Sequence, residues 1–204
     1  ANNNVGVGSN ASVVSLSATT GTLTVGAITT SGGHAAAGAT TNRNGGNAGN
    51  IILGAGAEVD ATTGARGGTI NLNGDLLAIG GFYVGDAARG LGGYIEVQSP
   101  VVLQADRLVS SGDTTGNITF LSSIDSDETS RSLTVTAGVA RALFDGVIGG
   151  SNPLSSLLVT SSTYTDIEKN VTTDGAAGVN VTATSQIRIG DQDLENGNGG
   201  GAVT

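Results

Sequence analysis

The chain has 204 residues, of which only 12% are charged, and it contains 35 glycines, three Phe, three Tyr and no Cys, Met or Trp. The absence of cysteine excludes a disulfide framework and thiolate metal sites. The formal net charge of -9 argues against a nucleic-acid partner, because phosphate binding requires clustered Lys and Arg. No uninterrupted apolar run reaches the roughly 18 residues of a membrane-spanning helix, so we expect no membrane insertion by this segment.

The same composition also favours a particular kind of folded protein. Few aromatic residues predict a thin interior filled by Val, Ile, Leu and Ala, and 38% hydrophobic residues are enough to drive folding. An acidic surface with a single lysine is typical of a soluble extracellular protein. Because no initiator Met is present, we interpret residues 1–204 as one continuous segment cut from a longer chain.

Short runs of alternating apolar residues, each bounded by turn-forming residues, recur along the chain. The clearest are 21–25 (GTLTV), 49–53 (GNIIL), 68–72 (GTINL), 93–97 (GYIEV) and 116–120 (GNITF). Looser copies lie at 132–135, 156–159 and 180–183, with an incomplete one at 201–204. Eight steps separate the first apolar residue of the first run, Leu23, from that of the last, Val203, and they average 22.5 residues.

A recurrence of this length is typical of a stacked array, and three short strands with three corners use about that many residues. We therefore predict an all-β fold, a single-stranded parallel β-helix (β-solenoid) of about nine coils of roughly 22–23 residues each. Strand alternation would direct Ile51, Leu53, Ile70 and Leu72 toward the axis and Asn71 toward water.

Two regions depart from this pattern. Residues 139–144 (VARALF) are predicted to form one helical turn, the only helix signal in the chain. Residues 28–49 are rich in Gly and small residues, which predicts a loop protruding from a corner. A 15-residue step between two of the runs is interpreted either as a short coil or as a marker that lies on a different face.

The glycines at 45, 46 and 49 approximate a phosphate-binding loop. That motif requires a following G-K-[ST] and a helix, and neither follows Asn50. We therefore interpret the segment as a corner at which a strand begins.

A calcium site is the one metal candidate. Asp191, Asp193 and Glu195 place carboxylates on alternate residues, as calcium loops do, but the Gly and the final Glu of that motif are replaced. A solvated acidic turn is the alternative, and a shorter acidic cluster lies at 125–128. We predict no cofactor other than this weak Ca²⁺ candidate.

Catalysis is not expected. His34 is the only histidine and has no acidic or nucleophilic partner nearby in the sequence. Glycan cleavage would require carboxylates and a basic residue in one groove, for example Asp125 and Asp127 with an arginine, but the basic residues are scattered. If the segment has a recognition surface, we expect it in the long glycine-rich loop around His34, Arg43 and Asn44.

The repeat style resembles a known family. Residues 146–160 (GVIGGSNPLSSLLVT) and 28–53 (ITTSGGHAAAGATTNRNGGNAGNIIL) resemble repeats of large bacterial surface and secreted exoproteins of the filamentous-haemagglutinin and autotransporter-adhesin type. The resemblance implies a right-handed β-helix that serves as a stalk outside a bacterial cell. The partial echo of a secretion motif at Asn152, Pro153 and Leu154 places this segment in the stalk and not in the secretion domain.

The sequence therefore predicts an extracellular structural segment, an adhesin stalk or the body of a surface filament. Its expected partners are neighbouring coils or copies of the same protein, and host or extracellular glycans. Two alternatives remain: a self-assembling filament subunit, whose end strands would pair with another copy, and a β-helix protein that binds or cleaves polysaccharide.

Overall fold

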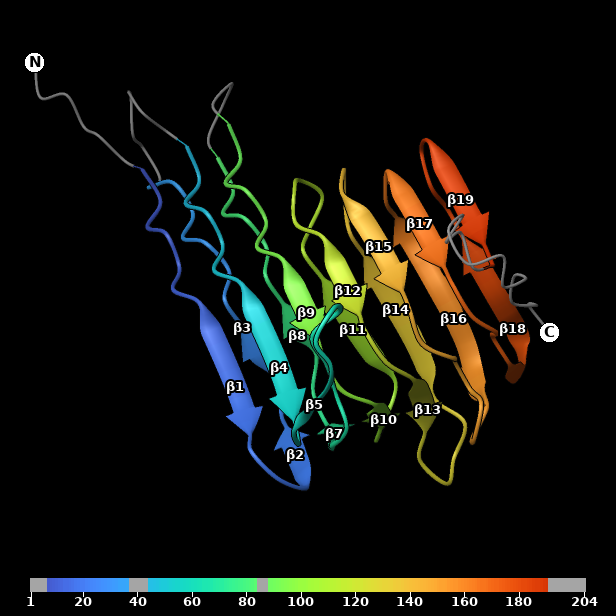
Figure 1. Ribbon diagram of the computed structural model, residues 1–204. Helices are drawn as coiled ribbons and strands as arrows, with labels where there is room; N and C mark the ends of the chain where they lie inside the picture. Colours follow the sequence, from blue (N-terminus) through green and yellow to red (C-terminus); the bar gives the residue numbers. More distant parts are fainter. Residues whose placement is uncertain (1–6, 37–43, 84–87, 191–204) are drawn as a thin grey trace, which may run out of the picture.

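The computed structural model describes residues 7–36, 44–83 and 88–190 (Figure 1). Within these residues the protein is all-β, as the alternating runs predicted, and no helix is assigned. None of the described residues therefore forms a helix long and apolar enough to cross a membrane. The strands build three parallel sheets and one antiparallel hairpin.

The chain visits the three parallel sheets in turn. β1 lies in a seven-stranded sheet, β2 in a four-stranded sheet and β3 in a six-stranded sheet, and β4 then returns to the seven-stranded sheet beside β1. This order is kept through β14, after which isolated bridges at Ile148 and Val171 take the place of strands in the four-stranded sheet. Each strand therefore pairs with the next strand of its own sheet, and the pairs are parallel (Figure 1).

The seven-stranded sheet runs the length of the molecule in Figure 1. Its strands, in order across the sheet, are β1 (Val14–Ala18), β4 (Ile51–Ala55), β9 (Ile95–Val97), β12 (Ile118–Phe120), β15 (Arg141–Phe144), β17 (Tyr164–Ile167) and β19 (Gln186–Ile189). Seven strands at a spacing of about 4.8 Å give a sheet about 29 Å wide.

The other two parallel sheets are shorter. The four-stranded sheet contains β2 (Thr22–Val25), β7 (Thr69–Leu72), β10 (Val101–Leu103) and β13 (Ile124–Ser126). The six-stranded sheet contains β3 (Ile28–Thr29), β8 (Leu76–Leu77), β11 (Arg107–Ser110), β14 (Ser132–Thr136), β16 (Leu154–Ser161) and β18 (Thr173–Val181).

The spacing between paired strands changes along the chain. Ile95, Ile118 and Ala142 pair in register at steps of 23 and 24 residues, close to the mean spacing in the sequence. Earlier in the same sheet the steps are longer, 37 residues from Val14 to Ile51 and 44 from Ile51 to Ile95. The evenly spaced runs at 21–25 and 49–53 therefore lie in different sheets, and the regular spacing predicted there was a coincidence.

Alternating side chains form the core between the sheets. Ile51, Leu53, Ile70 and Leu72 are at most 1% exposed, which confirms their predicted inward direction. The remaining core is aliphatic apart from two phenylalanines, Phe120 and Phe144, whose rings stack with centroids 5.6 Å apart. Each layer buries its apolar side chains against the layers above and below it.

The helical turn predicted at residues 139–144 is wrong, because Arg141–Phe144 form β15. Ala142 and Phe144 are buried, whereas Arg141 and Leu143 lie on the opposite face and are only partly exposed. Pairing with β12 on one side and β17 on the other supplies backbone hydrogen bonds that an isolated helical turn would lack.

Extended segments without strand assignment continue the sheets at one end of the molecule. Residues 8–13, 44–50 and 88–94 lead into β1, β4 and β9, while residues 30–36 and 77–83 follow β3 and β8 (Figure 1). We call these five segments the glycine bundle. Their amide donors recur at every third residue, and the pairs are Gly8, Ala11 and Val14 with the carbonyls of Asn44, Asn47 and Asn50, then Gly45, Ala48 and Ile51 with those of Ala88, Leu91 and Tyr94.

A three-residue period is that of the polyproline II conformation, which forms no hydrogen bonds within a segment and must bond to its neighbours. Hydrogen bonds also cross the bundle, from Gly46 N–H to the Gly33 carbonyl and from Gly81 N–H to the Gly46 carbonyl. A Cβ at Gly46 would lie 1.9 Å from the Ser9 carbonyl oxygen, so no side chain fits there. The predicted protruding loop is therefore, at residues 30–36 and 44–50, a packed continuation of the sheets.

The antiparallel hairpin of β5 (Glu58–Asp60) and β6 (Ala65–Arg66) is inserted after β4. The Asp60 carboxylate accepts hydrogen bonds from the amides of Thr62 and Thr63 and closes the turn, and Gly64 follows at a φ of 81°. Arg66 then lies against Gly54 on the outer face of the seven-stranded sheet, where its Nε donates to Gln98 at 2.9 Å. The sequence DATTG carries this turn signal, although the alternating pattern of the parallel strands does not reveal the hairpin.

Candidate ligand-binding face

The outer face of the seven-stranded sheet carries a row of polar and aromatic side chains. Each residue of this row precedes an inward-facing residue, so the parallel register aligns one member from each strand. We call this the outer row, and from the β1 end it contains Val13, Asn50, Tyr94, Asn117, Arg141, Tyr164 and Gln186.

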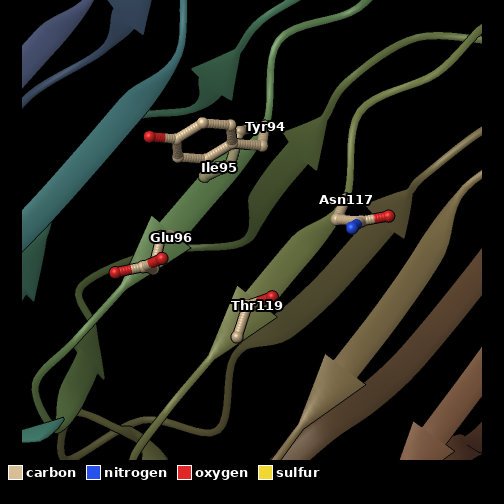
Figure 2. A pocket seen from close by; sticks show the side chains of 5 residues that line it. All are labelled: Tyr94, Ile95, Glu96, Asn117 and Thr119. Atoms are coloured by element: carbon tan, nitrogen blue, oxygen red, sulfur yellow. The ribbon is translucent and has the colours of Figure 1, made fainter. Parts of the chain in front are cut away.

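A shallow hollow of about 200 Å³ lies where β9 and β12 run side by side. It is lined by Tyr94, Ile95, Glu96, Asn117 and Thr119. Figure 2 shows Tyr94 and Glu96 projecting from β9, and Asn117 and Thr119 from β12. Ile95 is fully buried, so the hollow offers a ligand one aromatic ring, one carboxylate, one amide and one hydroxyl group.

Hydrogen bonds hold the residues of the hollow in place. The Tyr94 amide donates to Asn50 Oδ1 at 3.1 Å, and its carbonyl accepts from Ile51 N–H at 2.9 Å. Asn117 Oδ1 accepts from the Arg141 amide at 3.1 Å, which directs the NH₂ group of Asn117 away from that bond. Glu96 accepts from Gln98 Nε2 at 2.7 Å and keeps its second oxygen as a free acceptor among the described residues.

Ion pairs cross the outer face beyond the hollow. Asp166 on β17 is only 2% exposed and lies between two arginines of the neighbouring strands. Arg141 Nε donates to one carboxylate oxygen of Asp166, and Arg188 Nε lies 3.7 Å from the other. Glu168 adds a second acidic group 4.0 Å from Arg141, so the arginines of this face are neutralised by carboxylates.

A second cluster of side chains lies in the glycine bundle. His34 Nδ1 accepts from the Phe82 amide at 2.9 Å, and the two rings pack with centroids 4.9 Å apart. The Arg89 guanidinium lies 4.3 Å from the centre of the Phe82 ring and pairs with Asp113. His34, which we predicted as part of a recognition loop, is thus fixed by its neighbours in the bundle.

The other predicted site residues fall into two groups. Asn44 Oδ1 accepts from the Ala88 amide at 3.1 Å, so its side chain joins two segments of the bundle. Arg43 and the predicted calcium ligands Asp191, Asp193 and Glu195 lie outside the described residues. Within the part of the chain that is described, no group of three or more His, Asp or Glu side chains is placed to hold a metal ion.

The acidic cluster at 125–128 is used in turns. Asp125 Oδ1 accepts from the Ser151 amide at 2.8 Å, whereas Asp127 forms a two-pronged ion pair with Arg131 at 2.9 and 2.8 Å. The hydrogen bond from Arg131 lowers the pKa of Asp127 below its usual range, and the Thr129 amide adds to the effect. These carboxylates are therefore committed to local structure.

Sequence reasoning did not single out the outer row. Its residues Tyr94, Asn117, Arg141 and Tyr164 follow one another at steps of 23, 24 and 23 residues, each immediately before an alternating run. That signal could have been found in the runs GYIEV and GNITF, but the same position in β15 was assigned to a helical turn. Comparison with protein families, curated proteins and solved structures finds no significant match to this chain.

Proposed function

We propose that the three parallel sheets are the faces of a β-solenoid whose role is structural and not catalytic. The observation that supports this proposal is the repeated order of the sheets, in which each strand bonds to the next strand of its own sheet. Such a stack can be lengthened by adding layers without changing the existing contacts, which suits a protein that holds two points apart.

We further propose that this solenoid is a stalk segment outside a bacterial cell, within an adhesin or surface appendage. The acidic, cysteine-free composition and the resemblance of the repeats to surface exoproteins support this location. The stacked sheets supply rigidity without disulfides, because every inner strand is hydrogen bonded on both edges.

Labelling of intact cells tests the proposed location. Antibodies raised against the purified chain should bind unpermeabilised cells of the source organism, and external protease should remove the signal. A cytoplasmic protein labelled in parallel serves as the control for cell integrity. Labelling that appears only after the cells are opened would contradict a surface stalk.

A self-assembling filament subunit is the second candidate. Within the described residues the outer edges of β1 and β19 have no strand partner, and the side chains there are partly exposed, with Leu16 at 38% and Ile187 at 44%. Such edges favour parallel pairing with another copy. Electron microscopy of the purified chain separates the two candidates, since continuous fibres would favour the filament and isolated particles the stalk.

A further inference from the structure

The hollow between β9 and β12 has the chemistry of a sugar-binding subsite. Tyr94 is 39% exposed and presents both an apolar ring face and a hydroxyl group. Glu96, Asn117 and Thr119 surround the hollow with an acceptor, a donor and a hydroxyl group that can do either. A pyranose ring has the matching features, an apolar C–H face and a rim of hydroxyl groups.

The hollow is also rigid before any ligand arrives. Tyr94 and Asn117 are held through their own backbone or side-chain bonds to strands on either side, as described above. Both strands lie inside the seven-stranded sheet and not at its edge. Little conformational freedom would therefore be lost on binding, which favours affinity for a small polar ligand.

A second aromatic residue lies further along the same outer row. Tyr164 is 42% exposed and is separated from Tyr94 by three strand spacings, or about 14 Å. Asn117 and Arg141 lie between the two rings and offer hydrogen-bond donors. An oligosaccharide lying across the strands could therefore contact both tyrosines.

The charges on this face select against anionic ligands. Arg141 and Arg188 are neutralised by Asp166, and Glu96 adds a negative charge in the hollow itself. The whole chain carries a formal charge of -9, so sulfated or uronate-rich polymers would be repelled. An uncharged glycan avoids this cost.

From these observations we propose that the outer row binds a neutral glycan, with one sugar ring stacked on Tyr94 and the chain directed across the strands toward Tyr164. This inference deepens the proposed function, on which it rests, because a surface stalk with such a site would also adhere to polysaccharide. The binding site itself is a property of the isolated chain and can be tested without cells.

Calorimetric titration with neutral oligosaccharides tests the proposal. The probes are cellohexaose, chitohexaose, xylohexaose and mannohexaose, with a heparin hexasaccharide as the anionic comparison. We expect at least one neutral hexasaccharide to bind and the heparin fragment to bind at least tenfold more weakly. Failure of all four neutral probes, or preference for the anionic one, would overturn the proposal.

Substitutions locate the site. Tyr94→Ala should weaken binding of the preferred hexasaccharide at least tenfold, while Tyr83→Ala, which removes a tyrosine of similar exposure outside the outer row, should leave it unchanged. Tyr164→Ala should weaken binding of the hexasaccharide but not of the matching disaccharide. Circular dichroism confirms folding of each variant, and equal losses for Tyr94→Ala and Tyr83→Ala would place the site elsewhere.

The outcomes also separate this inference from the proposed function. Surface labelling of cells without glycan binding would leave the stalk and remove the sugar site. Glycan binding by the isolated chain without surface labelling would keep the site and remove the extracellular stalk.

Discussion

Single glycines in this protein have very different roles, although their chemistry is identical. Gly46 lies inside the glycine bundle, where an added Cβ would meet the Ser9 carbonyl oxygen at 1.9 Å. Gly26 lies at an exposed position where an added Cβ would meet nothing within 4 Å. The tolerance of each position for a methyl group is therefore set by neighbouring segments.

This difference predicts opposite responses to alanine. Gly46→Ala should destabilise the protein by about 3 kcal/mol, because the backbone of the bundle must move apart. Gly26→Ala should be neutral or stabilising by up to about 1 kcal/mol, since it restricts the unfolded chain. Urea unfolding of both variants measures this, and equal free energies of unfolding would show that the bundle is not tightly packed.

The ion pair of Asp127 and Arg131 predicts a dependence of stability on pH. Because the pKa of Asp127 is lowered in the folded protein, the pair contributes fully at neutral pH, and its contribution is lost as the pH falls through that lowered pKa, below about pH 4. Asp127→Asn should therefore be less stable at pH 7 and lose less stability on acidification than the unsubstituted chain.

Thermal unfolding between pH 7 and pH 2.5 measures this effect. The control is Glu128→Gln, which changes an exposed carboxyl group one residue away. We expect it to keep the pH profile of the unsubstituted chain. A parallel profile for Asp127→Asn would mean that the ion pair does not contribute to folding.

At the scale of elements, the glycine bundle joins segments that lack the usual strand pairing. Asparagine supplies the missing acceptors. Asn44, Asn47 and Asn50 accept through Oδ1 from the amides of Ala88, Leu91 and Tyr94, so the three-residue period of the backbone is repeated in the side chains. Each amide that is not bonded to a carbonyl in this pair of segments is thereby satisfied.

Removal of one asparagine should loosen this pair of segments. Asn47→Ala leaves the Leu91 amide without its acceptor at 2.9 Å and should destabilise the protein by about 1 kcal/mol. Asn73→Ala is the matched control, because the Asn73 side chain is exposed and makes no hydrogen bond among the described residues. Hydrogen exchange of the Leu91 amide should accelerate in the first variant only, and unchanged exchange there would argue against the bond.

At the scale of the whole molecule, stability should vary along the stack. Inner layers are covered on both sides, as in β12, whose neighbours β9 and β15 both pair with it. β19 has one neighbour, and its residues are all exposed. Because each layer contacts only its neighbours, we expect opening to begin at the ends.

Hydrogen exchange followed by mass spectrometry measures this gradient. Amides of β9, β12 and β15 should exchange most slowly, and those of β1, β18 and β19 at least tenfold faster. Uniform protection from β1 to β19 would contradict independent layers and indicate that the ends are covered by another copy. Repeating the measurement at several protein concentrations separates these cases.

Much of the fold could be predicted from the sequence, because local alternation decides which side chains face inward. The burial of Ile51 and Leu53 follows from GNIIL alone, since the period of a strand is two. Residues 139–144 failed because a run as short as VARALF fits either a helical turn or a strand, and only pairing with β12 and β17 decides between them.

The sequence by itself determined the all-β class, the inward and outward faces of the strands, and the absence of disulfides. Only the tertiary structure decided which strands are neighbours, because insertions of different length separate Val14 from Ile51 and Ile51 from Ile95. The same register places Tyr94 and Tyr164 on one row, and the close approach of the Ser9 carbonyl to Gly46 explains why the bundle needs glycine there. Contacts between distant residues carry this information, and local patterns do not.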